Sequence, residues 1–236
     1  LLMDNSIEYL LLIAAGFRLG SISVCINTRI GVDEMKQVIQ QTSPTILVYD
    51  EQYQEAADQF KESFSGGIIC VNSSNNGLSS LSQWWDSGPE EPDITTPSPN
   101  DGAIIIPTAA VGGIPKGALL SQNNILASVL AHLVHFGEES MSGLLSLLPP
   151  YHVMGLCSAW TTLFSSGKDV LQRQFDAEEA VSILDSQKLT YFGSFPPILE
   201  RVLDAANSQN SKLNSLKMVF GLEGPQNIER LEKETN

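Results

Sequence analysis

The sequence has little positive charge, few cysteines and no long apolar run. Thirteen lysines and arginines stand against 27 aspartates and glutamates, which gives a formal net charge of −14 and a pI near 4.5. Such a chain repels the phosphates of nucleic acids and of anionic lipids, and no basic cluster offsets this charge locally. We therefore predict that the protein does not bind nucleic acid. An anionic nucleotide would need a local positive site.

The longest apolar segment, Ile7–Phe17, is interrupted by Glu8 and is too short to cross a bilayer. No basic region followed by a cleavage site precedes it, so it does not resemble a signal peptide. We predict no membrane span, and we expect this segment to be a largely buried helix with Asn5 or Ser6 as its N-cap.

The cysteines are odd in number, widely spaced and set among apolar residues: Cys25, Cys70 and Cys157. This pattern indicates neither a zinc site nor a disulfide framework, and it fits a reducing cytoplasm. Hydrophobic residues make up 42% of the chain and the mean hydropathy is +0.01, so the chain can bury a substantial core. We predict a globular, cytoplasmic protein.

Strand-like and helix-like segments alternate along the chain, which is typical of an α/β protein with mainly parallel sheets and helices on both faces. The stretch 72–100 is rich in Ser, Asn, Gly and Pro and reads as a connecting loop with one short helix near 79–85, anchored by Trp84-Trp85. We expect two interlocked layers, a first α/β subdomain over 1–96 and a second over 97–236. The predicted strands are 21–26, 45–49, 68–71, 103–106, 144–148, 169–171, 190–192 and 217–220, and the predicted helices are 6–19, 32–41, 52–64, 121–136, 153–165, 177–187, 196–207 and 228–234.

A glycine-containing loop with a lysine follows the apolar run Ala103–Ile106. It reads Pro107-Thr-Ala-Ala-Val-Gly-Gly-Ile-Pro-Lys-Gly117, and the residues from Ala118 onward indicate the start of a helix. Inward-turned backbone N–H groups, the Lys116 charge and a helix N-terminus together would bind phosphate. A lysine at a helix start is otherwise disfavoured by the helix dipole, which favours a functional role for it. The alternative is a strand-loop-helix corner with incidental glycines.

The spacing differs from the common loop G-x-x-x-x-G-K-[ST]. It resembles instead the signature of the adenylate-forming enzymes, which include acyl-CoA synthetases, aryl-CoA ligases, luciferases and the adenylation domains of peptide synthetases. Their loop runs roughly aromatic-Thr-Ser-Gly-Thr-Thr-Gly-x-Pro-Lys-Gly, and the matching residues are Thr108, Gly113, Pro115, Lys116 and Gly117.

The middle of the loop departs from this signature. Ala109-Ala-Val-Gly112 stands where the family has Ser-Gly-Thr-Thr, so three hydroxyl donors are missing. Charge-assisted hydrogen bonds to phosphate oxygens are worth about 1.5–3 kcal/mol each. We therefore expect weakened or altered ATP binding.

Further segments resemble other parts of the same family, in the expected order along nearly the whole chain. Leu147–Leu156 resembles a Pro-aromatic-His-x-x-Gly turn, Thr190–Pro197 a strand that ends in a proline turn, and Leu216–Pro225 a strand and Gly-Gly-[Glu/Ala]-Pro turn beside the adenine and acyl pockets. The upstream segments Asn5–Leu10, Gly20–Arg29 and Pro44–Asp50 also resemble the family. This implies the fold of the large N-terminal domain of acyl-CoA synthetases. Because nothing matches the later aromatic-Gly-x-Thr-Glu motif, we expect a fragment without the C-terminal domain, inactive by itself.

The resemblance implies ATP-dependent activation of a carboxylic acid to an acyl-adenylate and then to an acyl-CoA thioester, as in fatty acid metabolism. ATP, Mg²⁺ and coenzyme A are the implied cofactors, and no metal ligand is assigned. An adenylation domain that loads a carrier protein and a non-catalytic nucleotide- or acyl-binding relative are the alternatives, and a homodimer is left open. The implied catalytic residues are His152 and Lys116, and the implied cofactor-binding residues are Thr108, Gly112, Gly113, Lys116, Gly117, Gly221 and Glu223.

Three other polar residues have more ordinary interpretations. His132 and His135 are three apart in a predicted helix and share a face, so they form either a metal-binding pair or, as we prefer, a packed or solvated pair. Asp101 precedes a strand and is expected on the surface. The alignment of Glu223 with the family turn can slip by one residue.

Overall fold

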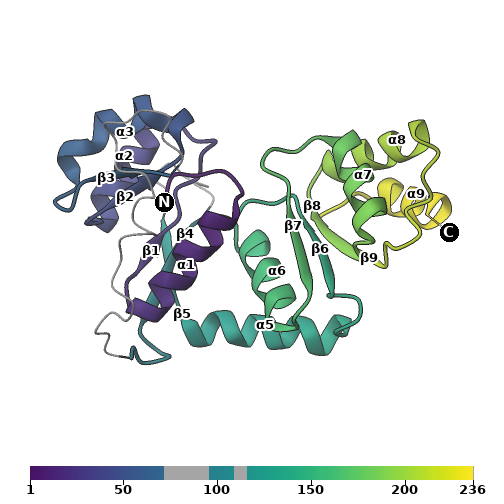
Figure 1. Ribbon diagram of the computed structural model, residues 1–236, viewed down its shortest axis with the longest axis horizontal. Coiled ribbons are helices and arrows are strands. Elements are labelled where there is room, and N and C mark those ends of the chain that lie inside the picture. Colours follow the sequence, from purple (N-terminus) through teal and green to yellow (C-terminus); the bar gives the residue numbers. More distant parts are fainter. Residues whose placement is uncertain (72–95, 109–115, 236) are drawn as a thin grey trace. The chain divides into compact units, whose positions relative to one another are not determined.

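The computed structural model describes residues 1–71, 96–108 and 116–235 (Figure 1). The short helix predicted near 79–85 and the pair Trp84-Trp85 lie outside these residues. Contacts divide the chain into two compact units, Leu1–Asn124 and Ile125–Asn236. The subdomain boundary between residues 96 and 97 stays a prediction.

The first unit contains both helices and strands, as predicted. Its helices are α1 (Ile7–Leu19), α2 (Val32–Thr42) and α3 (Gln54–Phe60), the last flanked by 3-10 turns at Glu51–Tyr53 and Lys61–Ser63. Its strands are β1 (Ser23–Val24), β2 (Leu47–Tyr49), β3 (Ile68–Cys70), β4 (Gly102–Pro107) and β5 (Gly117–Ser121). The sequence pattern predicts each of these strands and α-helices except β5.

The N-terminal segment joins the two sheets of the first unit. The order β1-β4-β5 forms one sheet and the parallel pair β2-β3 forms the other. Leu2 makes a parallel bridge to Tyr49, and its N–H donates to the Val48 carbonyl at 2.9 Å. On its other side, the Leu1 carbonyl accepts from the N–H of Ile26 at 2.9 Å. A short extended segment therefore lies between β1 and β2.

Apolar faces of the helices build the core of this unit. Met35, Val38 and Ile39 on α2 are buried together with Phe60 of α3 and Leu47 of β2. The predicted Ser6 cap is present, because its Oγ accepts from the N–H of Tyr9 at 3.2 Å. This hydrogen bond satisfies one of the unpaired donors in the first turn of α1.

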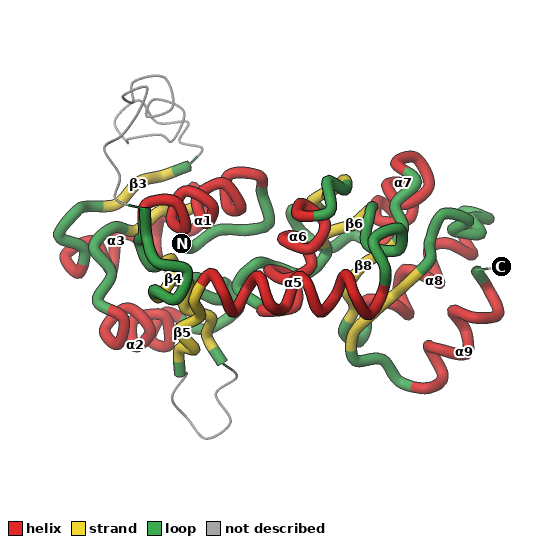
Figure 2. Tube along the Cα trace, turned by 90° about the horizontal axis from the view of Figure 1, so that it is seen from below, coloured by secondary structure: helices red, strands yellow, loops and turns green. Residues whose placement is uncertain are grey.

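The second unit has one parallel sheet of order β7-β6-β8-β9. Helix α5 (Gln122–Phe136), which is drawn as one continuous helix in Figure 2, begins in the first unit and continues into the second. The strands are β6 (Gly143–Ser146), β7 (Lys168–Leu171), β8 (Tyr191–Ser194) and β9 (Met218–Gly221). The other helices are α6 (Val153–Phe164), α7 (Ala177–Gln187), α8 (Ile198–Ser208) and α9 (Pro225–Glu234).

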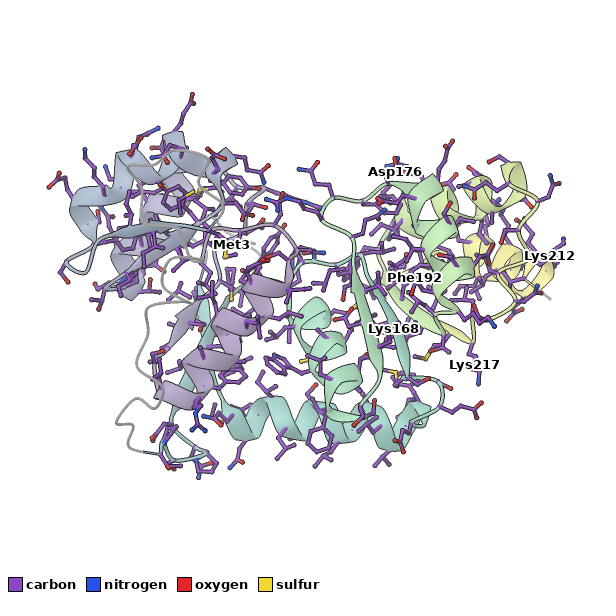
Figure 3. The ribbon with its side chains drawn as sticks, in the orientation of Figure 1. Met3, Lys168, Asp176, Phe192, Lys212 and Lys217 are labelled. Atoms are coloured by element: carbon purple, nitrogen blue, oxygen red, sulfur yellow. The ribbon has the colours of Figure 1, made fainter. Side chains whose placement is uncertain are left out.

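Helices cover both faces of this sheet (Figure 1). Leu145 and Phe192 point into the core formed with α7 and α8, and Phe192 is fully buried there (Figure 3). On the opposite face, the hydroxyl of Tyr191 donates to the Ser158 carbonyl of α6 at 3.1 Å. The neighbouring residues Tyr191 and Phe192 face opposite sides of the sheet because side chains alternate along a strand with a period of two.

The predicted α/β class with mainly parallel sheets is confirmed, with β4–β5 as the antiparallel exception. Cys25, Cys70 and Cys157 are buried free thiols. None of the described helices combines the length and apolar character needed to cross a membrane.

Candidate active site

The lysine loop lies at the end of a hairpin rather than at the start of a helix. Strands β4 and β5 pair antiparallel as far as Pro107 and Gly117. Beyond this pair, both donors of Thr108 reach the carbonyl oxygen of Lys116, the N–H at 2.7 Å and the hydroxyl at 3.0 Å. These bonds close the base of the loop and hold the backbone of Lys116.

The expectation that a helix starts at Ala118 is therefore wrong. Ala and Leu favour helices locally, but β4 is a buried strand whose backbone needs a partner on each edge. Its Ile104 is fully buried, β1 pairs with one edge, and residues 117–121 pair with the other. Tertiary pairing thus overrides local propensity, and Lys116 does not stand at the N-terminus of a helix, so no helix dipole acts on it.

A capping signal marks where the helix does begin. The Ser121 hydroxyl oxygen accepts from the N–H of Asn124 at 3.2 Å, and the Asn124 side-chain oxygen accepts from the N–H of Ser121 at 3.0 Å. This reciprocal pair is a form of capping box, and the pattern Ser-x-x-Asn is visible in the sequence. It supports the predicted helix 121–136 and sets its first residue at Gln122.

Lys116 is exposed at the base of the hairpin loop, so its ammonium group is available to an anion. Gly117 has a structural reason to be glycine, since a Cβ there would lie 2.6 Å from Cγ2 of Ile105. Gly112 and Gly113 lie outside the described residues. Of the predicted loop residues, the structure thus brings together Thr108, Lys116 and Gly117.

The remaining predicted site residues lie at one edge of the second sheet. Because all four of its strands are parallel, their carboxyl ends meet at the same edge, where ligands bind in open α/β folds. His152 follows β6, Gly221 ends β9, and Glu223 comes two residues later. The predicted placement of His152 and Glu223 on turns after strands is confirmed, whereas Gly221 is the last residue of β9 itself.

His152 is the N-cap residue of α6 and is exposed. Its N–H donates to the Pro149 carbonyl at 3.0 Å, and its ring lies 5.0 Å from the ring of Tyr151. Position 155, near the start of α6, is occupied by glycine because a Cβ there would lie 2.5 Å from the Pro149 carbonyl oxygen. The helix can therefore begin close against the end of the strand, which presents the imidazole at the carboxyl edge.

Glu223 is half-buried and hydrogen-bonded through both carboxylate oxygens. One oxygen accepts from the hydroxyl of Ser194 at 2.6 Å, and the other accepts from the side-chain amide of Asn227 at 3.1 Å. Sequence reasoning did not single out Ser194 or Asn227. Ser194 lies within a segment that resembles the family, but no local signal pairs it with a carboxylate 29 residues away.

Gly221 has a backbone conformation that favours glycine, with φ of 151°. A Cβ at this position would lie 1.8 Å from the carbonyl oxygen of Ser194, and the next residue, Leu222, donates its N–H to the same oxygen at 3.2 Å. The turn after β9 is thereby held tightly against the end of β8.

His132 is partly buried and His135 is exposed, which agrees with the packed or solvated pair preferred from the sequence. Nδ1 of His132 lies 3.3 Å from the hydroxyl of Thr161, and burial lowers the pKa of His132, with a smaller contribution from His135. The ring of His135 makes an edge contact with Phe136 at 4.6 Å. Within residues 1–71, 96–108 and 116–235, no group of three or more His, Cys, Asp or Glu side chains could hold a metal ion.

Asp101 is an exposed surface residue, as expected. Its carboxylate accepts from the N–H of Ser98 at 2.9 Å, which stabilises the turn before β4.

These features define an α/β protein with candidate ligand-binding turns at the carboxyl edge of a parallel sheet. Comparison with known proteins is more specific: the sequence pattern of the family described as AMP-binding enzyme matches residues 1–233. The chain therefore belongs to the AMP-binding enzyme family.

Relatives and solved structures agree with this assignment. The chain is 26% identical over 221 residues to the indoleacetate–CoA ligase of Aromatoleum aromaticum, a match that covers 91% of this chain and 43% of the relative. It is also 26% identical over 222 residues to a 4-chlorobenzoate–CoA ligase of Arthrobacter, covering 92% and 41%. The chain thus spans less than half the length of these curated relatives.

The fold is shared with solved ligases. A long-chain-fatty-acid–CoA ligase from Archaeoglobus fulgidus superposes with a TM-score of 0.83 at 25% identity, covering 98% of this chain and 47% of that structure. ATP-bound MatB from Rhodopseudomonas palustris superposes with a TM-score of 0.82 at 21% identity, covering 99% and 46%. The predicted likeness to the N-terminal domains of acyl-CoA ligases is confirmed.

Proposed function

We propose that the protein, in its natural length, is an acid–thiol ligase that activates a carboxylic acid with ATP and transfers it to coenzyme A. The observation that carries this proposal is the family match over residues 1–233, with CoA ligases among the relatives. Because those relatives act on different acids, the proposal names no particular acid. Membership in fatty acid metabolism and a cytoplasmic location stay predictions.

The proposed chemistry has two steps. A carboxylate oxygen of the substrate attacks the α-phosphorus of ATP, the bond from that phosphorus to the bridging oxygen breaks, and pyrophosphate leaves. The thiol sulfur of coenzyme A then attacks the acyl carbon, AMP leaves, and the thiol proton passes to solvent. The protein would act by positioning and by stabilising charge, with no covalent bond to a side chain.

In this proposal Lys116 binds oxygens of the polyphosphate through its exposed ammonium group, and backbone N–H groups of Gly112 and Gly113 assist it. Thr108 is proposed to position Lys116 and not to bind phosphate itself, since its N–H and its hydroxyl both donate to the Lys116 carbonyl oxygen. Gly117 allows the close approach of the two hairpin strands.

At the second sheet, His152 is proposed to contact the reacting carboxylate or the α-phosphate, because its imidazole can donate a hydrogen bond at the exposed carboxyl edge. Gly221 and Glu223 are proposed to contribute to nucleotide binding. The resemblance implies Mg²⁺, which proteins usually bind through one or two carboxylates together with substrate phosphates. The described residues contain no group of three or more His, Cys, Asp or Glu side chains that could hold a metal ion, and no step is assigned to one.

A non-catalytic nucleotide- or acyl-binding protein is the second candidate. It is favoured by the segment Ala109-Ala-Val-Gly112, which carries no hydroxyl group where polyphosphate would be bound.

Exchange of labelled pyrophosphate into ATP separates the two candidates. The natural-length protein is assayed with carboxylic acids of graded chain length, both aliphatic and aromatic, and acyl-CoA formation is then followed by mass spectrometry. A ligase gives exchange that depends on one class of acid and gives a thioester with coenzyme A. A protein that binds ATP but shows no exchange with any acid is the non-catalytic relative.

A further inference from the structure

The segment Leu1–Met3 has the hydrogen-bond pattern of a strand in the interior of a parallel sheet. Leu1 bonds to β1 on one side, where its nitrogen donates to the Val24 carbonyl at 2.6 Å. Leu2 bonds to β2 on the other side, where its N–H donates to the Val48 carbonyl at 2.9 Å. Bonds that alternate between two neighbouring strands are those of an interior strand, which has a partner on each edge.

Backbone groups of β1 and β2 continue this pattern on the amino-terminal side of Leu1. Directly after β1, the N–H of Cys25 donates to β4 at 3.2 Å, so the N–H of the preceding Val24 points to the opposite side. The N–H of Leu47 donates to the residue before β3 at 3.2 Å, so the N–H of Val48 points away from β3. Both N–H groups are therefore directed toward the line along which the segment Leu1–Met3 runs.

A cavity of about 520 Å³ lies beside these groups. Ile22 and Val24 line it on the side of β1, Ile46 and Leu47 line it on the side of β2, and Leu1 contributes to the same lining. None of the described side chains that line this cavity is charged, and Ile22 and Ile46 are 47% and 44% exposed. Because protein interiors contain few voids larger than a water molecule, a space of this size between two strands requires an apolar occupant.

The α-amino group of Leu1 indicates what kind of occupant fits. Burial lowers the pKa of this group, because removal from water disfavours the charged ammonium form. A peptide N–H at the same position would make the same hydrogen bond to the Val24 carbonyl without the cost of burying a charge. The surroundings of the Leu1 nitrogen therefore suit a peptide bond better than a free amine.

We infer that the cavity is a strand slot, filled in the natural-length protein by the extended residues that directly precede Leu1 and run parallel to β1 and β2. The chain spans less than half the length of its curated relatives, so a protein of their length has further polypeptide to supply this strand. Because both faces of an interior parallel strand are covered, its residues are expected to be mainly apolar and uncharged. The inference does not depend on the proposed function.

A filled slot would join the two sheets of the first unit into one sheet, in which the new strand lies between β1 and β2. Strand β1 has only two residues, and β4 is its partner on one edge. A second partner on the other edge would satisfy its remaining backbone groups. The hairpin β4–β5, which carries Lys116, would then be part of a continuous sheet.

Hydrogen exchange of individual backbone amides in the natural-length protein tests whether the slot is filled. The N–H groups of Ile26 and Asp50 donate to the segment Leu1–Met3 and provide the reference for protected amides. The N–H groups of Val24 and Val48 are expected to exchange as slowly as this reference, about a hundredfold or more below the rate of a free amide. Exchange of Val24 and Val48 at the free rate overturns the inference, whether or not the reference amides are protected.

Photo-cross-linking in the natural-length protein identifies the occupant. A diazirine analogue of leucine is placed at Ile46, which lines the slot. The matched control has the same analogue at Leu11 on α1, which is likewise 44% exposed but is not among the described residues that line the slot. We expect cross-links from position 46, and not from position 11, to the residues directly before Leu1 in the same chain. Absence of these cross-links overturns the inference, as does a cross-link to a second copy, which isotopic labelling of one copy distinguishes.

Discussion

The antiparallel hairpin of the first unit and the parallel sheet of the second present their candidate site residues in different ways. In the second unit, strand after strand ends at one edge, so His152 and Glu223 are positioned by turns whose backbones pack against neighbouring strands. In the first unit, Lys116 is held by hydrogen bonds across a hairpin, and its side chain is exposed.

This difference has an energetic consequence. The tightly packed glycines at the parallel edge, Gly155 and Gly221, face backbone carbonyl oxygens, which cannot move without disturbing a strand. The tightly packed glycine of the hairpin, Gly117, faces the side chain of Ile105, which can reorient. Substitutions of equal size are therefore expected to cost more at the parallel edge, whereas substitutions at Lys116 should affect ligand binding and leave the fold intact.

The largest effect is expected for Gly221→Ala. The new Cβ would meet the Ser194 carbonyl oxygen at 1.8 Å, and the φ of 151° is unfavourable for alanine. We expect a loss of about 3 kcal/mol or more in the free energy of unfolding, measured by urea denaturation. Gly224→Ala is the matched control, because nothing lies within 4 Å of its Cβ position. Equal stability of the two variants would contradict a close-packed edge.

A smaller effect is expected from the buried carboxyl group of Asp169 on β7. Burial raises its pKa from 3.8 to about 6, although the Ser146 hydroxyl donates to one oxygen at 2.7 Å; the other oxygen is buried and has no hydrogen-bond partner among the described residues. Because the folded state holds this proton more tightly than the unfolded state, stability is lost as pH rises from about 4 through 6, by roughly 2–3 kcal/mol in total.

Asp169→Asn should remove this pH dependence and stabilise the protein at pH 8, whereas the exposed Asp185→Asn on α7 should do neither. Denaturation midpoints at pH 5 and pH 8 provide the measurement. A parent protein whose stability does not fall between these values would show that Asp169 is solvated.

The two units also differ in how much of their structure the sequence predicts. In the second unit each element was predicted to within a few residues, and α7 is found at the predicted 177–187, because every strand and helix there carries its own periodic signal. In the first unit β5 was missed because its residues favour a helix locally, and the segment Leu1–Met3 was missed because three apolar residues carry no period.

The candidate site residues also fall into two groups, those that a continuous motif predicts and those that it does not. Residues within continuous motifs, such as His152 and Lys116, can be proposed from the sequence, because the motif itself names them. Ser194 was not, because its role depends on a partner that the sheet brings close but the sequence places far away. Long-range pairing of single polar residues leaves no local pattern.

Gly117→Ala tests the hairpin side of the comparison. Its Cβ would meet a side-chain methyl group of Ile105 rather than the backbone, at 2.6 Å. Since that side chain can adjust, we expect a destabilisation of about 1 kcal/mol, clearly less than for Gly221→Ala. A loss equal to that of Gly221→Ala would show that the hairpin is as rigid as the parallel edge.

The smallest effect is expected for the double substitution Ala109→Ser with Val111→Thr, which restores two of the hydroxyl groups that the loop lacks. The apparent affinity for ATP should increase by about tenfold or less, or stay unchanged, with stability unaffected. Substrate-saturation curves for ATP provide the measurement. Weaker ATP use would indicate that these side chains do not face the polyphosphate.

The most direct test of the account is the dependence of pyrophosphate exchange on ATP concentration in Lys116→Ala, with the exposed Lys36→Ala on α2 as control. Loss of one charged contact to phosphate should raise the apparent KM for ATP by about ten- to hundredfold, since such a contact is worth about 1.5–3 kcal/mol. The KM for the carboxylic acid should change little. Exchange kinetics in Lys116→Ala equal to those of the unmodified protein would contradict a phosphate-binding role for the hairpin loop and favour the non-catalytic relative.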